Sequence, residues 1–427
     1  MPMFEYAREL LGDEEGGEDP YAHHVPVYLQ ATAGMRLVEE GAAKAFYDAV
    51  FAALVSPQEG SDWFAKHFRL KREDIGTLDG EKEGYFAAVS ANYLSGSVGM
   101  DLNLMVARGD YTDAGYIGAL DMGGGSTQIV YYTQREGCIK SVDHPIEESV
   151  VVAGGMKHSD FFVYSYLSYG CDRVRLRLWD RLVEGIVVST DDDTAALPKE
   201  VENPCGFVGH LAVHSGVRLR GTGQAHECMM TIRSLLWPDV VHEDTVRRHG
   251  NGQRVRSIGG IIHPQPIRKE AKLYAMSLYF FALDCMRVVG KDQVLEKEWP
   301  NPTINELHDA LEKFCSLPWK RLEDATDTLH TYTDTQTLPH RCLEVVYMTV
   351  LLRDGYGIDP SSRGITYAFD VGGLEVEWTL GLVLTLHAAD HESVNFLEST
   401  KSLIEPLDVS VSEVEMGGVQ GTDGVQL

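Results

Sequence analysis

The residues best suited to chemistry lie in one stretch, residues 119–132, which reads ALDMGGGSTQIVYY. Asp121 supplies a hard carboxylate oxygen that suits a divalent cation or the waters around it. The glycines that follow, Gly123 to Gly125, have no Cβ, so their backbone can approach phosphate oxygens closely. Ser126 and Gln128 carry neutral groups able to hold an attacking water. The pattern therefore predicts metal, phosphate and water chemistry in one loop.

This stretch differs from the Walker phosphate loop, which needs a lysine and opens into a helix. Here a short apolar lead-in precedes the glycines, and Ile-Val-Tyr-Tyr, a run suited to a strand, follows them. The expected element is a β-hairpin with the glycines at its turn. An ordinary glycine-rich turn is the alternative interpretation. We favour the phosphate site because the aspartate, the glycines and Ser-Thr-Gln occur together.

The segment before this loop supplies a second set of candidates. A strand at Val25–Leu29 runs into residues 31–36, ATAGMR, a small-residue turn that opens a helix. The Thr32 hydroxyl is therefore expected at a strand end. Arg36 is predicted to be a helix-surface or ion-pair residue.

Glu83 is the candidate general base. It lies at the start of a helix expected over residues 85–94, where the positive end of the helix dipole favours an ionised carboxylate. A lone glutamate at this position is usually only a stabilising charge. It acts as a base only if it faces the Asp121 loop.

The rest of the chain is expected to supply scaffold, followed by an acidic, Ser- and Gly-rich tail. The patterns predict an aromatic helix, a long apolar helix, a strand and a second apolar helix, at residues 161–169, 272–289, 365–369 and 380–387.

Length and charge narrow the class of protein. A chain of 427 residues suggests two domains, and the N-terminus has neither the basic patch nor the apolar core of a signal peptide. No apolar run is long enough to predict a membrane span. The net charge of −27 repels nucleic acid and makes polyphosphate binding costly unless a cation mediates it. Seven cysteines without a CxxC motif leave two possibilities open, pairing across long loops or buried thiols.

Four stretches together resemble the apyrase, or nucleoside triphosphate diphosphohydrolase, family. They match its second to fifth signatures in order, at Pro26–Arg36, Glu83–Gly84 with Ala91–Leu94, Asp121–Gln128 and Trp378–Gly381. The resemblance implies an α/β, two-lobed actin-like (ribonuclease H-like) fold with the active site in the inter-lobe cleft. It also implies hydrolysis of nucleoside tri- or diphosphates to the monophosphate, with Ca²⁺ or Mg²⁺.

The resemblance assigns a role to each matching residue. Glu83 would be the general base, and Thr32, Ser126 and Gln128 would position the attacking water. Asp121 would bind the metal through water, and Trp378 would line the same hydrated site. The phosphate would be bound by Gly123, Gly124, Gly125, Ser126 and Ala33, and the nucleobase by Phe281 and Arg341. Arg341 stands where the family usually has tyrosine.

The family also pairs cysteines that correspond to Cys205 with Cys228 and Cys315 with Cys342. This implies a secretory or extracellular location. Two features depart from the family. Its first signature, Asp-x-Gly-Ser-Ser-Gly-Thr, is absent, and Ala87-Ala88 replaces Gly-Trp.

The expected domains follow from this comparison. An incomplete N-terminal lobe at residues 1–84 would be completed by residues 380–405, the C-terminal lobe would span 85–379, and residues 406–427 would form a tail. With the first phosphate loop missing, the chain as printed is expected to be poorly active. One alternative is therefore a catalytically impaired nucleotide-binding or interaction protein. Another is a different actin-like phosphotransferase, such as an exopolyphosphatase.

Overall fold

The computed structural model describes most of the chain. The described residues are 2–10, 25–56, 63–105, 116–133, 156–186, 199–238, 246–248, 254–258, 261–264, 267, 271–323 and 333–389. The predicted tail at 406–427 lies outside them. No helix among them is long and apolar enough to cross a bilayer.

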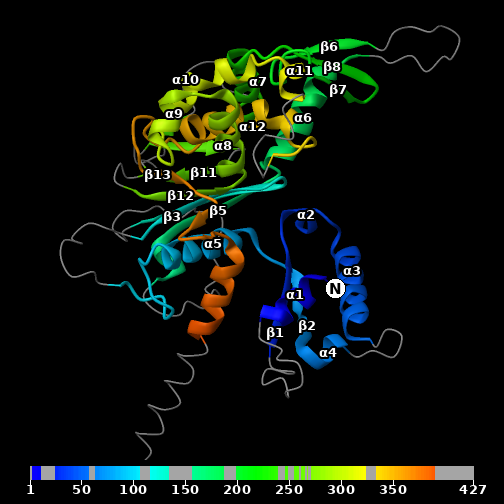
Figure 1. The fold of residues 1–427 in the computed structure, drawn as a ribbon, viewed down its shortest axis with the longest axis vertical. Helices are drawn as coiled ribbons and strands as arrows, with labels where there is room; N and C mark the ends of the chain where they lie inside the picture. Colours follow the sequence, from blue (N-terminus) through cyan, green and yellow to red (C-terminus); the bar gives the residue numbers. More distant parts are fainter. Residues whose placement is uncertain are drawn as a thin grey trace, which may run out of the picture.

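A mixed five-stranded sheet is the centre of the larger lobe. Its strands run in the order β13 (Ile365–Tyr367), β12 (Leu273–Ser277), β3 (Gly118–Met122), β4 (Ser126–Tyr132) and β5 (Phe161–Leu167). The first three are parallel, whereas β4 is antiparallel to both β3 and β5. Helices cover both faces (Figure 1). Strands β3 and β4 are therefore buried on both sides.

One face of the sheet is covered by α5 (Gly80–Leu94) and by a helix at residues 378–389. These two helices meet at Gly381. A Cβ built on Gly381 would lie 1.9 Å from the carbonyl oxygen of Phe86, so only glycine allows this approach. The contact places Trp378, the first residue of the second helix, beside the sheet.

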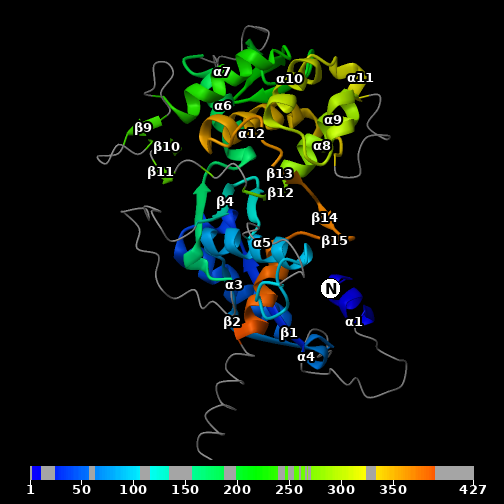
Figure 2. The ribbon, with the colours of Figure 1, turned by 90° about the vertical axis from the view of Figure 1, so that its left-hand side faces the viewer.

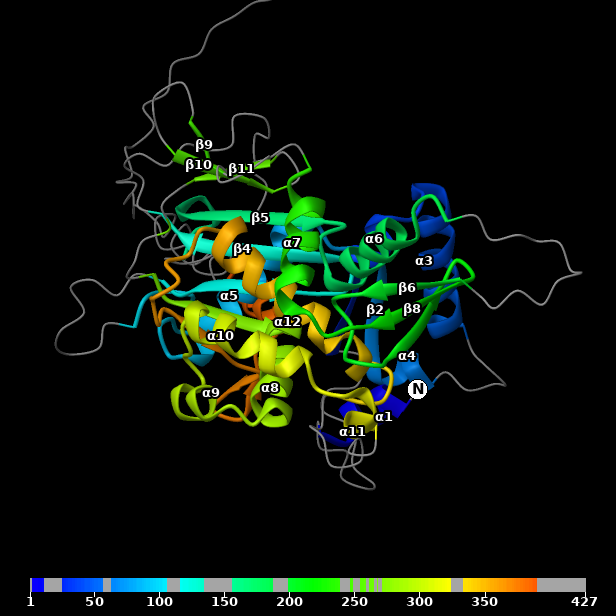
Figure 3. The ribbon, with the colours of Figure 1, turned by 90° about the horizontal axis from the view of Figure 1, so that it is seen from above.

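The opposite face carries the largest apolar core. Figures 1 and 2 show its helices stacked on this side, and Figure 3 shows them from above. They are α6 (Cys171–Val183), α7 (Ala225–Leu236), α8 (Leu278–Gly290), α9 (Gln293–Glu298), α10 (Ile304–Cys315), α11 (Trp319–Glu323) and α12 (Arg341–Val350). Disulfides join Cys205 to Cys228 and Cys315 to Cys342, as the family resemblance implied.

Small sheets border this lobe. One contains β6 (Glu200–Asn203), β8 (Val217–Gly221) and β7 (Leu211–His214), and another contains β9 (Val246–Arg248), β10 (Arg254–Ile258) and β11 (Ile261–Pro264). The third is a ribbon of β14 (Asp370–Val371) and β15 (Leu374–Glu375).

The N-terminal elements form a separate unit with a small core of their own. Strands β1 (Val25–Ala31) and β2 (Phe68–Thr77) pair in parallel. The helices of this unit are α1 (Pro2–Leu10), α2 (Ala33–Arg36), α3 (Glu40–Val55) and α4 (Trp63–His67). This unit lies beside α5 (Figure 1). The lobe boundaries given by the sequence stay a prediction.

Two sequence predictions are wrong. Residues 161–167 form strand β5 rather than a helix, because their aromatic side chains pack in register on β4. Residues 272–289 are not one helix, since β12 occupies 273–277 and α8 begins only at Leu278. The strand predicted at 25–29 and the hairpin around the glycine turn are confirmed. The helix predicted over 85–94 is also present, but it begins earlier, at Gly80, and therefore includes Glu83.

Candidate active site

The hairpin of β3 and β4 holds Asp121 at the end of a buried strand. Asp121 pairs with Gln128 across the hairpin, and Met122 pairs with Thr127. The Thr127 hydroxyl donates to the Asp121 carbonyl at 2.8 Å and lies 3.2 Å from the Tyr356 hydroxyl. All five side chains are buried. The position of Asp121 is thus fixed from behind by the core.

The glycine turn is oriented by the start of α6. The N–H groups of Cys171 and Asp172 donate to the carbonyls of Gly123 and Gly124, at 3.0 and 3.1 Å. In a trans peptide the N–H points opposite to the C=O. The N–H groups of Gly124 and Gly125 are therefore directed away from α6. Neither N–H group donates a hydrogen bond to any of the described residues.

The turn that follows β1 lies against these glycines. A Cβ on Gly125 would come within 2.8 Å of the Ala33 Cβ, so Ala33 already contacts the glycine turn. Thr32 precedes Ala33 as the N-cap of α2, and its carbonyl accepts from Met35 and Arg36. The structure thus brings Thr32 and Ala33 next to the predicted phosphate loop.

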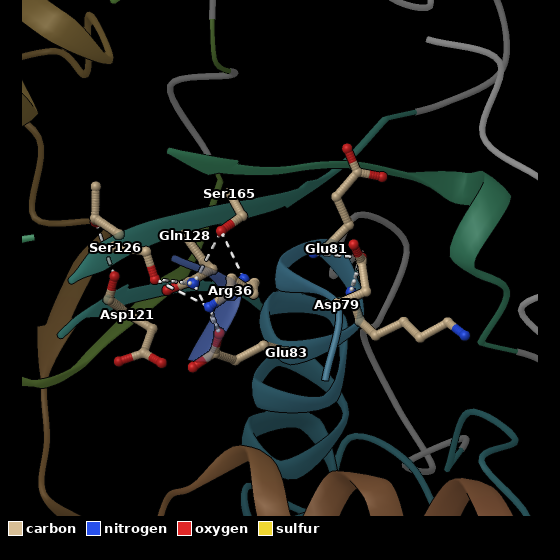
Figure 4. Close-up of polar contacts among 10 residues, drawn as sticks. Arg36, Asp79, Glu81, Glu83, Asp121, Ser126, Gln128 and Ser165 are labelled. Carbon is tan, nitrogen blue, oxygen red and sulfur yellow. Dashed lines mark hydrogen bonds and ion pairs between the residues drawn. The ribbon is translucent and has the colours of Figure 1, made fainter. Parts of the chain in front are cut away.

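Glu83 reaches the hairpin from the first turn of α5. The side chain of Asp79 caps this helix by accepting from the N–H groups of Glu81 and Lys82. Gln128 Nε2 donates to Glu83 Oε2 at 3.0 Å and to Ser126 Oγ at 2.9 Å (Figure 4). Three predicted site residues from two distant segments therefore share one hydrogen-bond network.

Arg36 and Ser165 complete this network. Arg36 Nη2 lies 2.5 Å from Glu83 Oε2 and 3.2 Å from Ser126 Oγ, and its Nη1 lies 3.4 Å from Ser165 Oγ. Gln128 Nε2 also lies 3.0 Å from Ser165 Oγ. The sequence correctly predicted an ion pair for Arg36 as one of two options, but not its partner. Ser165 carried no signal, because its segment read as a helix.

The electrostatic environment of Glu83 suits a base. Burial raises the pKa of its carboxyl to about 7, and the nearby charge of Asp121 adds to this rise. Arg36 acts in the opposite direction by attracting the ionised form. A carboxyl with a pKa near neutrality can accept a proton and release it again under ordinary conditions.

Asp121 is the candidate ligand of a divalent cation. Burial raises the pKa of its carboxyl, the charge of Glu377 adds to this, and a hydrogen bond with Ser277 opposes it. Ser277 has φ of 57° and ψ of −130°, an uncommon conformation for a residue other than glycine. It lies at the junction of β12 and α8, and sequence reasoning did not single it out.

The residues present fit a hydrated cation rather than one enclosed by protein. No group of three or more His, Cys, Asp or Glu residues within the described ranges could hold a metal. Magnesium commonly keeps several waters and is bound by one or two carboxylates together with substrate phosphates. A buried carboxylate at Asp121 beside open glycine amides matches that requirement. Trp378 is half-buried beside the same sheet.

The two predicted nucleobase residues lie in different surroundings. Phe281 is half-buried on α8 and packs against Phe280 and Phe369. Arg341 is buried at the start of α12, where its Nη1 lies 2.5 Å from Glu344 Oε2. An arginine held in this way is part of the core, and the nucleobase role of the pair stays a prediction.

The chain is similar to known proteins in both sequence and fold. A model of the GDA1/CD39 (nucleoside phosphatase) family matches residues 3–400. The chain is 26% identical to ectonucleoside triphosphate diphosphohydrolase 8 of Rattus norvegicus, over 86% of this chain and 68% of that protein. It is 24% identical to a nucleoside-triphosphatase of Pisum sativum, over 89% and 74% of the two chains. A crystal structure of nucleoside triphosphate hydrolases from Neospora caninum superposes with a TM-score of 0.57 at 16% identity, over 89% of this chain and 76% of that one.

Proposed function

Because the chain belongs to the GDA1/CD39 (nucleoside phosphatase) family and has its two-lobed actin-like α/β fold, we propose that it hydrolyses nucleoside tri- or diphosphates to the monophosphate and phosphate. The observation that carries the proposal is the network of Glu83, Ser126 and Gln128 beside the glycine turn. It joins a candidate base, water-holding groups and free backbone donors at one place.

Each group has one task in the proposed reaction. Ser126 and Gln128 hold a water, and Glu83 takes its proton as the water attacks the terminal phosphorus. The bond from this phosphorus to the bridging oxygen breaks, and the shortened nucleotide leaves. The free N–H groups of Gly124 and Gly125 donate to the terminal phosphate, where negative charge must be stabilised. Such a displacement needs placement and charge stabilisation more than covalent help from the protein. The water-positioning role of Thr32 and the phosphate contacts of Gly123, Ser126 and Ala33 are part of the same proposal.

The proposed cofactor is Ca²⁺ or Mg²⁺, held by Asp121 through water and lined by Trp378. When bound, the cation would offset the charge of the polyphosphate beside the carboxylates of Asp121 and Glu83. The chain carries a net charge of −27, so a cation is needed to bridge these like charges. We further propose a secretory or extracellular location, in line with the ectonucleotidase names of the relatives and with the two disulfides.

Calorimetry with a non-hydrolysable nucleoside triphosphate tests binding. Titrations of the full chain with Ca²⁺, with Mg²⁺ and with EDTA should show binding only when the cation is present. Equal affinity in EDTA would contradict the proposal that nucleotide binding depends on a divalent cation. Phosphate release from nucleoside tri- and diphosphates then separates the enzyme from a protein that only binds nucleotide.

A further inference from the structure

Arg36 belongs to the N-terminal unit, yet its guanidinium lies within the network of the larger lobe (Figure 4). Its side chain is only 13% exposed. The guanidinium passes directly over Gly80, where a Cβ would lie 1.9 Å from Arg36 Nη1 and 2.3 Å from Ser165 Oγ. The absence of a side chain at Gly80 therefore makes room for this contact.

The two oxygens of Glu83 have different surroundings. Arg36 Nη2 and Gln128 Nε2 both donate to Oε2, at 2.5 and 3.0 Å. Oε1 accepts no hydrogen bond from the residues that the structure describes, and in Figure 4 it points toward the side where Asp121 lies. Two donors on one oxygen fix the plane of the carboxylate, so the direction of the free oxygen is set as well.

The charge of Arg36 bears on the same carboxylate. The charged groups that face Glu83 are Arg36 from α2, Asp121 from β3 and Asp79 from its own helix. Burial and the two acids favour the neutral form of Glu83, which cannot act as a base. Arg36 is the cation that opposes them.

We propose that Arg36 is a positioning residue for the reaction. It holds Oε2 of Glu83, in its ionised form, so that Oε1 is presented to the attacking water. This inference rests on the proposed hydrolysis and adds a role for the segment that follows β1. Two other roles are possible for such an arginine, a tie between α2 and α5 or a contact to the substrate phosphate, and the following experiment separates them.

The experiment compares R36A, R36K and R36A combined with E83Q, with R72A as the matched control. Arg72 makes an ion pair with Asp48 at 2.6 Å within the same N-terminal unit, away from the network. We expect R36A to lower kcat by about ten- to hundredfold, as for loss of a charge-assisted hydrogen bond. The Kd of a non-hydrolysable nucleotide should stay within about threefold of wild type. R36K should restore part of kcat, and R72A should leave kcat unchanged.

The double variant gives the sharpest discrimination. If Arg36 acts through Glu83, R36A in the E83Q background lowers kcat no further. Additive losses would show that Arg36 is a structural tie and would overturn the proposal. An unchanged kcat with a weaker Kd would also overturn it, in favour of a phosphate contact. If R36A does not fold, Gly80→Ala provides a second test. The added Cβ should displace the guanidinium although Arg36 itself stays in the chain, and the same loss of kcat is expected.

Failure of the proposed function is recognised separately. If wild type releases no phosphate, the hydrolysis proposal fails, whatever Arg36 does. The carboxyl-carbon NMR titration of Glu83 still tests the contact, because removal of Arg36 should raise the pKa of Glu83. An identical titration in wild type and R36A would overturn the inference.

Discussion

Glu83→Gln gives a prediction with two independent readouts. The amide keeps an oxygen that can accept from Arg36 and Gln128 at the position of Oε2. It cannot take a proton from water, so turnover should fall by about a hundredfold or more. Nucleotide binding should be retained, because the phosphate donors and Asp121 are unchanged.

The second readout is the pH dependence of stability. The pKa of Glu83 is about 7 in the folded chain, against 4.5 for a free carboxyl. Because folding raises this pKa, the contribution of Glu83 to stability is present below about pH 4.5 and is lost as the pH rises through 7. A rise of this size corresponds to about 3 kcal/mol when Glu83 is fully ionised. E83Q should therefore gain about 2 to 3 kcal/mol relative to wild type between about pH 5 and about pH 8.5.

Urea unfolding followed by tryptophan fluorescence measures this difference, and phosphate release measures turnover. Glu81→Gln is the matched control, since it removes the same charge from the same helical turn without touching the hairpin network. It should leave turnover within a few-fold of wild type. Turnover of E83Q at the wild-type rate would show that Glu83 is not the general base. A stability difference that does not vary with pH would show that Glu83 is not held in the environment described.

Three further predictions follow from other contacts. Asp121→Asn should abolish the effect of Ca²⁺ or Mg²⁺ on nucleotide affinity in calorimetry, because it removes the proposed anionic ligand; an unchanged cation effect would reassign the metal. Gly381→Val should lower the midpoint of thermal unfolding and weaken turnover, since a Cβ there meets the Phe86 carbonyl at 1.9 Å; a wild-type midpoint would contradict this packing. Loss of the Cys315–Cys342 disulfide, which closes a separation of 27 residues, should cost about 2 to 4 kcal/mol in urea unfolding, and a smaller loss would indicate that the bond adds little.

The sequence predicted the hairpin and the helix of the candidate site, because each is determined by residues within one short segment. The glycines of the 123–125 turn and the strand-forming run after them define the hairpin without tertiary information. The sequence also predicted a helix over residues 85–94 with Glu83 at its start, although the Asp79 cap that begins α5 at Gly80 was not identified. Glu83 could therefore be placed on a first helical turn before the fold was known.

The two wrong predictions have a common cause. Leu273 to Ser277 form a strand buried in a parallel part of the sheet, so they read as a continuous apolar run that merges with α8. Only the unusual backbone of Ser277 separates the two elements. The prediction for Phe161 to Leu167 was wrong for a related reason. Aromatic residues occur in both helices and strands, and here pairing with β4 selects the strand.

The partner of Arg36 is a feature that no local pattern could predict. Arg36 and Glu83 are 47 residues apart, and Arg36 and Ser165 are 129 apart. Their contacts depend on how the N-terminal unit docks beside α5 and on the space left by Gly80. Residue types identified the candidates, whereas their assembly into one network depends on the tertiary fold.

The central claim is that a water activated by Glu83 attacks the terminal phosphorus of a nucleoside polyphosphate. Turnover of a nucleoside diphosphate in ¹⁸O-labelled water, with Ca²⁺ or Mg²⁺ and with E83Q beside wild type, tests it most directly. If Glu83 activates this water, the released phosphate should contain one ¹⁸O atom, the nucleoside monophosphate should contain none, and E83Q should release almost no phosphate. Label in the monophosphate, or equal release by the two proteins, would contradict it.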